Sequence, residues 1–205
     1  MRRIVDISIA VLVLPLLAPL FAIVSLLIVT ESSGCPLYGG WRAGKDGVPF
    51  RMWKFRTMVT GADRMGGAIT TRSDSRITRI GRFLRKTKID ELPQFLNLLL
   101  GDLTLVGPRP ESPEIVARYR PEQRRVLEMK PGITGPTQVQ YTSIEAEAIP
   151  EDNSEQFYID YLLSSKILLD LEYQRKRSFL SDCRVLLETA FLILRSFAGS
   201  FSRAQ

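Results

Sequence analysis

A long apolar segment near the start of the chain does most to limit its possible folds. Residues Ile7 to Val29 include no charged side chain. As a straight helix this segment would be roughly 35 Å long, enough to cross a bilayer. Met1-Arg2-Arg3 precedes it, as in a signal peptide, but the run is longer than a usual signal core and no small-x-small site follows. We expect an uncleaved membrane anchor over residues 1–31 and a second domain over residues 32–205.

Two prolines complicate a simple crossing. Pro15 and Pro19 lack an amide hydrogen and, four residues apart, share one face of the helix. A sharp bend there would return the chain to the side from which it entered. Basic residues flank the segment on both sides, which places both ends in the cytoplasm: Arg2, Arg3, Arg42, Lys45, Arg51 and Lys54. We predict a re-entrant helical hairpin, with a kinked spanning helix as the alternative.

The chain's composition excludes several kinds of active site. None of its 205 residues is a histidine, so Ser-His-Asp triads, Cys-His dyads and HExxH zinc sites are impossible. Cys35 and Cys183 lie far apart and suggest neither a zinc site nor a disulfide framework. Lys and Arg number 28 against 22 Asp and Glu, which favours anionic partners such as lipid headgroups, phosphorylated substrates or nucleic acid.

The remaining patterns predict an α+β fold that is mostly helical. Val48 to Met58 alternates basic and apolar residues, as a half-buried strand does, within a strand-and-turn region over 34–60. Residues 61–75 are small and polar and predict a mobile loop. Helices are expected over 75–88, from Asp90 to Gly101, over 112–129 and across most of 154–197, with rigid turns at 107–110 and 131–136.

The expected helix over 75–88 is strongly basic. Ile77, Ile80 and Leu84 recur at helical spacing. The remainder is largely basic: Arg76, Arg79, Arg82, Arg85, Lys86 and Lys88. Such an amphipathic helix suits an anionic membrane surface, and a solvated helix packed on the core is the alternative.

The candidate chemistry follows directly after this basic helix. Asp90 and Glu91 stand near the expected start of the next helix, where the helix dipole favours negative charge. A lone Asp-Glu pair is most often a helix cap or a solvated face. Arg109 lies between Pro108 and Pro110, and two fixed φ angles would hold its guanidinium steady for a phosphate.

The order of five segments resembles one family, the bacterial sugar transferases, which are monotopic polyprenyl-phosphate phosphoglycosyl transferases. The resemblance covers residues 2–195 and suggests the small form, little more than the catalytic core. The segments are the proline-broken apolar N-terminus, KFRTM at 54–58, KIDELPQ at 88–94, GDLTLVGPRP at 101–110 and KPGITG at 130–135. No single segment is specific, but their combination is.

This resemblance implies roles for particular residues. Asp90 would be the nucleophile that attacks the β-phosphate of a UDP-sugar and expels UMP, before polyprenyl phosphate takes the phosphosugar. Glu91 would activate the acceptor or orient the site, and Mg²⁺ is expected near Asp90. The resemblance also assigns positions in the anionic site and one in the membrane bend: Lys54, Arg56, Arg85 and Arg109, and Pro19.

The chain departs from the family's pattern at two places. Ala18 stands before Pro19 where the family often has serine. Pro136-Thr137 follows GITG in place of Trp-Ala, and Gln140-Tyr141-Thr142 replaces an Asn-Gly-Arg-like stretch. The second set of changes leaves the sugar open more than the reaction.

Two other functions compete with an enzyme on the cytoplasmic face of the bacterial inner membrane. A non-catalytic scaffold at the membrane surface would use the same anchor and the same basic helix. A nucleic-acid-binding module is disfavoured, because the basic run lacks interleaved aromatics and a recognition motif. The expected partners are therefore a UDP-sugar, polyprenyl phosphate and a phospholipid membrane, with no nucleic acid. Homo-oligomerisation is left open.

Overall fold

The computed structural model describes residues 2–65, 74–150 and 154–201. It is mostly helical with two small sheets, as predicted for the fold class. The helices longer than a single turn are α1 (Arg2–Glu31), α2 (Arg79–Thr87), α3 (Gln94–Leu100), α4 (Pro113–Ala117), α5 (Pro136–Ala148), α7 (Ser164–Lys176) and α8 (Phe179–Phe201). The short α6 (Ser154–Phe157) continues through a π-helical stretch, Tyr158–Leu163, into α7.

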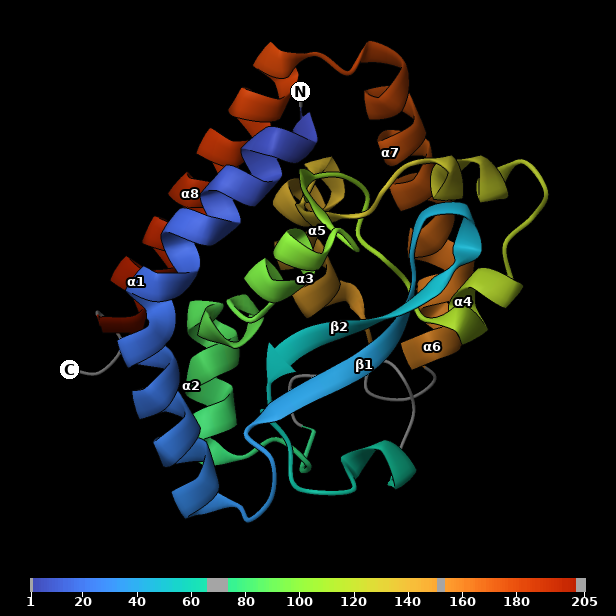
Figure 1. Cartoon of the computed structure of the whole chain (residues 1–205). Helices are drawn as coiled ribbons and strands as arrows, with labels where there is room; N and C mark the ends of the chain where they lie inside the picture. Colours follow the sequence, from blue (N-terminus) through green and yellow to red (C-terminus); the bar gives the residue numbers. More distant parts are fainter. Residues whose placement is uncertain (1, 66–73, 151–153, 202–205) are drawn as a thin grey trace.

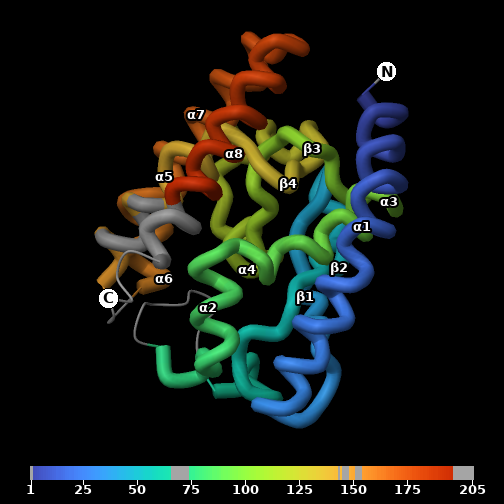
Figure 2. The backbone as a smooth tube through the Cα atoms, turned by 90° about the vertical axis from the view of Figure 1, so that its left-hand side faces the viewer, coloured from blue at the N-terminus to red at the C-terminus, as the bar shows by residue number. Residues whose placement is uncertain are grey.

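Helix α1 runs along one side of the molecule for most of its length (Figures 1 and 2). Its most apolar 18-residue stretch has a mean hydropathy of 2.8 and is only 11% buried, so the helix is long and apolar enough to cross a membrane. The exposed apolar surface of α1 would be costly to leave in water.

The predicted re-entrant hairpin is not confirmed. The chain forms one helix from Arg2 to Glu31, and both Pro15 and Pro19 lie inside it. Each proline removes one backbone hydrogen bond, but the remaining backbone hydrogen bonds keep the helix continuous. The helix therefore does not reverse at Pro19, whose role as the membrane bend has no support in the backbone.

The β1–β2 hairpin confirms the predicted strands. Strand β1 (Leu37–Ala43) pairs antiparallel with β2 (Pro49–Phe55), and Tyr38 lies opposite Lys54. The polar loop predicted over 61–75 lies partly outside the described residues. The segment that follows the hairpin packs closely against α2, because a Cβ at Gly81 would lie 2.0 Å from the carbonyl oxygen of Thr57. Glycine at this position lets α2 pack directly against the KFRTM segment.

The second sheet was not predicted. Strand β3 (Thr104–Val106) pairs in parallel with β4 (Gly132–Thr134), which joins the two segments expected to be rigid turns. The backbones meet at glycines, since a Cβ at Gly132 would lie 2.2 Å from the amide nitrogen of Gly107. The GPRP and PGITG segments therefore form one rigid unit.

Two expected helices have different bounds, and one helix was not predicted. The basic helix begins at Arg79, after an N-cap at Thr78, and ends at Thr87. The helix expected over 112–129 divides into α4 and a 3₁₀ segment, Gln123–Glu128, with Pro121 between them. Helix α5 covers residues 136–148, for which no element was predicted beyond the turn at 131–136.

Among the residues that the structure describes, the apolar core consists of three clusters. The largest joins α4 to the α6–α7 helix through side chains that include Ile115, Tyr158 and Ile167. A second packs α1 against β2 and α2: Val24, Ile28, Phe55 and Leu84. The third lies under the hairpin, at Phe50, Met52 and Leu103.

Candidate active site

The Asp90-Glu91 pair lies in a tight turn between two helices. Helix α2 ends at Thr87, and Lys88, which caps it, has a left-handed φ of 61°. A single 3₁₀ turn, Ile89–Glu91, follows it. Helix α3 starts only after Pro93, which has no amide hydrogen to continue the turn. The pair therefore does not open a long helix, as the sequence suggested, but is held at a sharp change of direction.

The two carboxylates have different neighbours. Glu91 Oε1 accepts a hydrogen bond from Lys54 Nζ at 2.9 Å and one from Arg109 at 3.1 Å. Asp90 is 6% exposed, and its Oδ1 has no hydrogen-bond partner among the residues that the structure describes. Glu91 is thus fixed between two cations, while Asp90 keeps an oxygen free for a ligand or a reaction.

Electrostatics separates the pair further. Burial raises the pKa of Asp90, and neighbouring Glu91 raises it too, against the opposing effect of Lys54. Burial alone would raise the pKa of Glu91, but Arg109 and Lys54 hold this pKa well below its usual value. Glu91 is therefore a permanent anion at neutral pH, and it is unsuited to act as a general acid.

Lys54 reaches the pair because α3 is fixed to strand β2. The buried Asn97 side chain accepts a hydrogen bond from the Trp53 amide at 2.9 Å. It also donates to the Arg51 carbonyl at 2.7 Å. These two bonds fix the strand beside the helix that follows the Asp90-Glu91 turn. Sequence reasoning missed Asn97, because one amide within an apolar helix carries no functional pattern.

The other predicted cations divide into two groups. Arg85 donates a hydrogen bond to Thr57 Oγ1 at 2.8 Å. Burial lowers the pKa of Arg85, against the opposing effect of the negative charge on Asp90. Arg56 faces elsewhere: its guanidinium donates to the carbonyl oxygen of Ser33 at 2.8 Å and to Thr60 at 3.0 Å. The structure thus brings Lys54, Arg85 and Arg109 to the carboxylate pair, whereas Arg56 binds the segment after α1.

Arg42 is a further cation near this site that the motifs did not indicate as a ligand. It lies on the same face of the hairpin as Lys54, because Tyr38 pairs with Lys54 and Arg42 is four residues further along β1. Burial lowers its pKa, and the nearby charge of Arg109 lowers it further. Arg42 therefore adds positive charge beside Arg109, which itself bonds Glu91, and such a group of cations suits a phosphorylated substrate.

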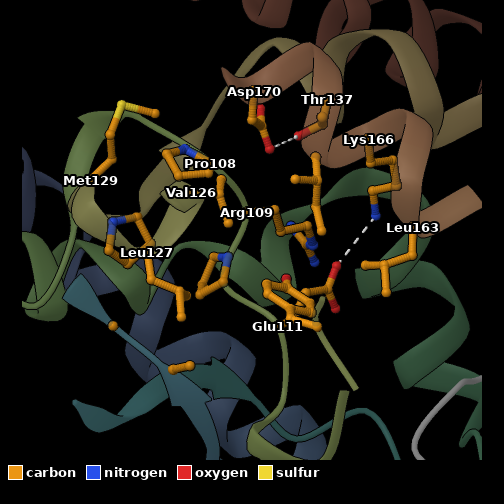
Figure 3. A pocket seen from close by; sticks show the side chains of 16 residues that line it. Pro108, Arg109, Glu111, Val126, Leu127, Met129, Thr137, Leu163, Lys166 and Asp170 are labelled. Carbon is orange, nitrogen blue, oxygen red and sulfur yellow. Dashed lines mark hydrogen bonds and ion pairs between the residues drawn. The ribbon is translucent and has the colours of Figure 1, made fainter. Parts of the chain in front are cut away.

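A buried polar cluster lies behind the Arg109 turn (Figure 3). Lys166 Nζ is 3.5 Å from Glu111 Oε1 and donates to Tyr158 Oη at 2.6 Å. The Tyr158 hydroxyl in turn donates to Glu111. In the same cavity Asp170 accepts a hydrogen bond from Thr137 at 3.4 Å. The helices α6–α7 thus hold the residue that directly follows Pro110.

A bound Mg²⁺ fits this arrangement through Asp90. Its free carboxylate oxygen is the kind of hard ligand that Mg²⁺ takes, and Mg²⁺ sites often use one or two carboxylates together with substrate phosphates and water. Glu91 is already bound by two cations. Among the described residues, Asp90 Oδ1 is therefore the atom of this pair that could hold such an ion.

Comparison with known proteins gives one consistent family. Residues 1–196 match the family described as bacterial sugar transferase. A UDP-glucose:undecaprenyl-phosphate glucose-1-phosphate transferase from Caulobacter vibrioides is 36% identical over 92% of this chain and 67% of its own length. The Escherichia coli protein of the same name is 32% identical over 93% of the chain and 39% of its own length.

A third relative acts on a different sugar. The UDP-N-acetylgalactosamine-undecaprenyl-phosphate N-acetylgalactosaminephosphotransferase of Aeromonas hydrophila is 34% identical over 97% of the chain. The alignment covers 44% of that relative, so this chain spans about two fifths of the longer relatives. Because the family match extends over nearly the whole sequence, the chain belongs to the bacterial sugar transferase family.

Proposed function

We propose that this chain transfers a sugar-1-phosphate from a UDP-sugar to polyprenyl phosphate and releases UMP. The observation that carries the proposal is the asymmetric carboxylate pair: Asp90 is buried with a free oxygen, beside a Glu91 fixed by Lys54 and Arg109. A buried, underbonded carboxylate facing cations is a suitable nucleophile toward a diphosphate. The relatives named above act on undecaprenyl phosphate and on UDP-sugars, according to their names.

The first step forms a covalent intermediate. A carboxylate oxygen of Asp90 attacks the β-phosphorus of the UDP-sugar, and the bond from that phosphorus to the bridging oxygen breaks. The bridging oxygen leaves with UMP, and the sugar phosphate remains on Asp90. Lys54, Arg109 and Arg42 offset the negative charge of the diphosphate, so that two anions can approach each other.

The second step restores the enzyme. An oxygen of the polyprenyl phosphate attacks the phosphorus of the intermediate, and the bond to Asp90 breaks. The products are the polyprenyl-diphosphate-sugar and a free carboxylate. Glu91 keeps Lys54 and Arg109 in place through both steps, because its two contacts are to these cations. This orienting role fits its low pKa better than proton transfer does.

Mg²⁺ would be held by Asp90 and the substrate phosphates. Its chemistry is to neutralise negative charge on the diphosphate. The protein's part is to keep Asp90 Oδ1 free of other hydrogen bonds within the described part of the chain.

We place the enzyme at the cytoplasmic face of the bacterial inner membrane. Helix α1 exposes large apolar side chains along its length, including Leu12, Leu16 and Leu26. Helix α8 exposes a second apolar set, with Phe179 77% and Leu187 73% exposed. Two such surfaces on one molecule are best explained by contact with lipid. This location brings the site to the phosphate of a lipid acceptor.

The test is UMP release by the purified membrane protein. UDP-glucose, UDP-galactose and UDP-N-acetylgalactosamine are each offered with undecaprenyl phosphate, with Mg²⁺ or with EDTA. We expect Mg²⁺-dependent UMP from at least one donor, and a phosphosugar adduct at Asp90 when the acceptor is omitted and the protein is analysed by mass spectrometry. The Asp90→Asn variant should form neither product. A scaffold would release no UMP, and an enzyme without the covalent step would release UMP only when the acceptor is present.

A further inference from the structure

Both ends of the apolar helix α1 carry polar side chains that bind the elements around the active site. At the N-terminal end, the Arg3 guanidinium donates to the carbonyl oxygens of Leu98 at 2.5 Å and Leu99 at 2.7 Å. These carbonyls belong to the last turn of α3, where the helix leaves them without partners of its own. Arg3 therefore caps the helix that follows the Asp90-Glu91 turn.

Asp6 makes a second connection at the same end. It is 4% exposed, and its carboxylate accepts hydrogen bonds from Thr104 Oγ1 at 2.9 Å and from the Leu105 amide at 3.1 Å. A buried carboxylate is tolerated only where such bonds satisfy it. A helix that served only to enter lipid would gain from an apolar residue at this position.

Glu31 makes the matching connection at the C-terminal end. Its two carboxylate oxygens accept hydrogen bonds from the amides of Arg79 and Ile80, each at 2.9 Å. These are the first two residues of α2, whose amides would otherwise lack partners. A negative charge is also favourable at this end of a helix.

Two of these contacts bind the helices that flank the carboxylate pair in the chain. Glu31 holds the start of α2, and Arg3 holds the end of α3; the turn with Asp90 and Glu91 lies between these helices in the chain. In the C-terminal part of α1, Val24 and Ile28 pack with Leu84 of α2. One helix therefore fixes both helices that set the direction of Asp90.

We propose that α1 is a brace for the active site as well as a membrane anchor, and that Arg3, Asp6 and Glu31 are positioning residues for Asp90. The proposal rests on the proposed function, because it gives Asp90 the role of nucleophile. A brace predicts that kcat depends on these contacts. The KM for the UDP-sugar should change little in Glu31 variants, because Glu31 bonds α2 while Lys54 lies on β2. Asp6 bonds β3, which precedes the Arg109 turn, so Asp6 variants are expected to change KM as well as kcat.

Asp6→Leu is the decisive variant, because an anchor and a brace predict opposite results. The change makes the apolar helix longer and should preserve or strengthen membrane association. It removes both hydrogen bonds to β3, so we expect kcat to fall at least ~10-fold. Asp6→Asn retains an acceptor for Leu105 and an amide that can donate to Thr104, and it should restore activity to within about threefold. Thr30→Leu, at an exposed position of the same helix, is the matched control and should leave kcat unchanged.

A second variant and a binding measurement separate positioning from unfolding. Glu31→Ala should lower kcat as Asp6→Leu does, while Glu31→Gln, which keeps one acceptor, should lose less. Titration with UDP should still give one site per chain in all variants. The proposal is overturned if Asp6→Leu keeps the wild-type kcat. It is equally overturned if activity falls only in proportion to lost UDP-binding sites or lost membrane association. Absence of UMP from the wild-type enzyme would instead contradict the proposed function, and with it the reaction that the brace serves.

Discussion

Asp90 and Glu91 are adjacent residues whose charges have opposite effects on the folded state. Glu91 contacts two cations, so its ionised form is favoured by folding. Asp90 is buried next to another carboxylate, so its ionised form is disfavoured. Burying an ionised group that has too few hydrogen bonds lowers the stability of the folded state, and such groups are common at functional sites.

This contrast predicts opposite stability changes in two isosteric variants. Asp90→Asn removes a poorly compensated buried charge and should raise the thermal unfolding midpoint by a few degrees, on the order of 2–4 °C per kcal/mol for a chain of this size. Glu91→Gln leaves Lys54 and Arg109 without their shared anion and should lower the midpoint. Thermal unfolding in detergent with EDTA measures both. Equal shifts of the same sign would contradict the asymmetry.

Asp170 gives a prediction for pH. Burial raises its pKa to about 7, against the lowering effects of Lys166 and of the Thr137 hydroxyl. The folded state then holds a proton that the unfolded state releases near pH 4, so this residue makes the protein less stable as pH rises from about 4 to 7. Asp170→Asn should therefore be more stable than wild type at pH 8 and similar to it at pH 4. A stability difference independent of pH would show that Asp170 stays ionised.

The sequence identified the residues with motifs and missed those without them. Asp90, Glu91, Lys54 and Arg109 meet in space as expected, because their segments form a rigid arrangement of hairpin, turn and parallel strands. Asp6 lies directly before the apolar run Ile7–Val29 and belongs to none of the motifs. An acidic residue at that boundary was the available signal, but its partners are nearly 100 residues away and local patterns cannot show them.

Among the elements, the helices α6–α7 determine how firmly the Arg109 turn is held. Lys166 is 6% exposed and bonds both Tyr158 and Glu111, and the Glu111 carbonyl also accepts a hydrogen bond from the Ala43 amide at 2.9 Å. The residue after Pro110 is thereby fixed to the C-terminal helices and to strand β1.

Breaking this connection should be costly and non-additive. Lys166→Met leaves the Glu111 carboxylate with the Tyr158 hydroxyl and should destabilise the protein by up to roughly 3–5 kcal/mol. Adding Glu111→Gln to that variant should recover part of the loss, because the unpaired charge disappears. Urea unfolding of the two single variants and the double variant gives the coupling energy. Additive losses would mean that the two groups do not act as a pair.

Elements defined by local pattern were predictable, and those defined by pairing were not. The alternation in 48–58 and the apolar spacing of Ile80 and Leu84 predicted β2 and α2. Strands β3 and β4 have three residues each and pair across 25 residues of intervening chain, so no periodicity marks them. The 3₁₀ turn at Asp90 likewise depends on Lys88 in a left-handed conformation, which no composition signals.

At the scale of the whole molecule, α1 lies against the body at both ends. Arg2 forms an ion pair with Asp182 of α8 at 3.2 Å, and Glu31 contacts α2. A helix crossing the bilayer from one face to the other would have to release one of these ends. Both ends on one side agree with the basic flanks, although the helix does not reverse between them.

We therefore predict that the two ends of α1 are labelled from the same side of the membrane. Cys35 follows the helix and is exposed, so it reports the C-terminal end. Arg2→Cys in a Cys35→Ser, Cys183→Ser background reports the N-terminal end, and Lys45→Cys in the same background reports the hairpin. A membrane-impermeant maleimide should label all three sites in inside-out vesicles and none in intact spheroplasts. Labelling of position 2 alone in spheroplasts would establish a spanning helix, since it would place that end across the bilayer from the active site.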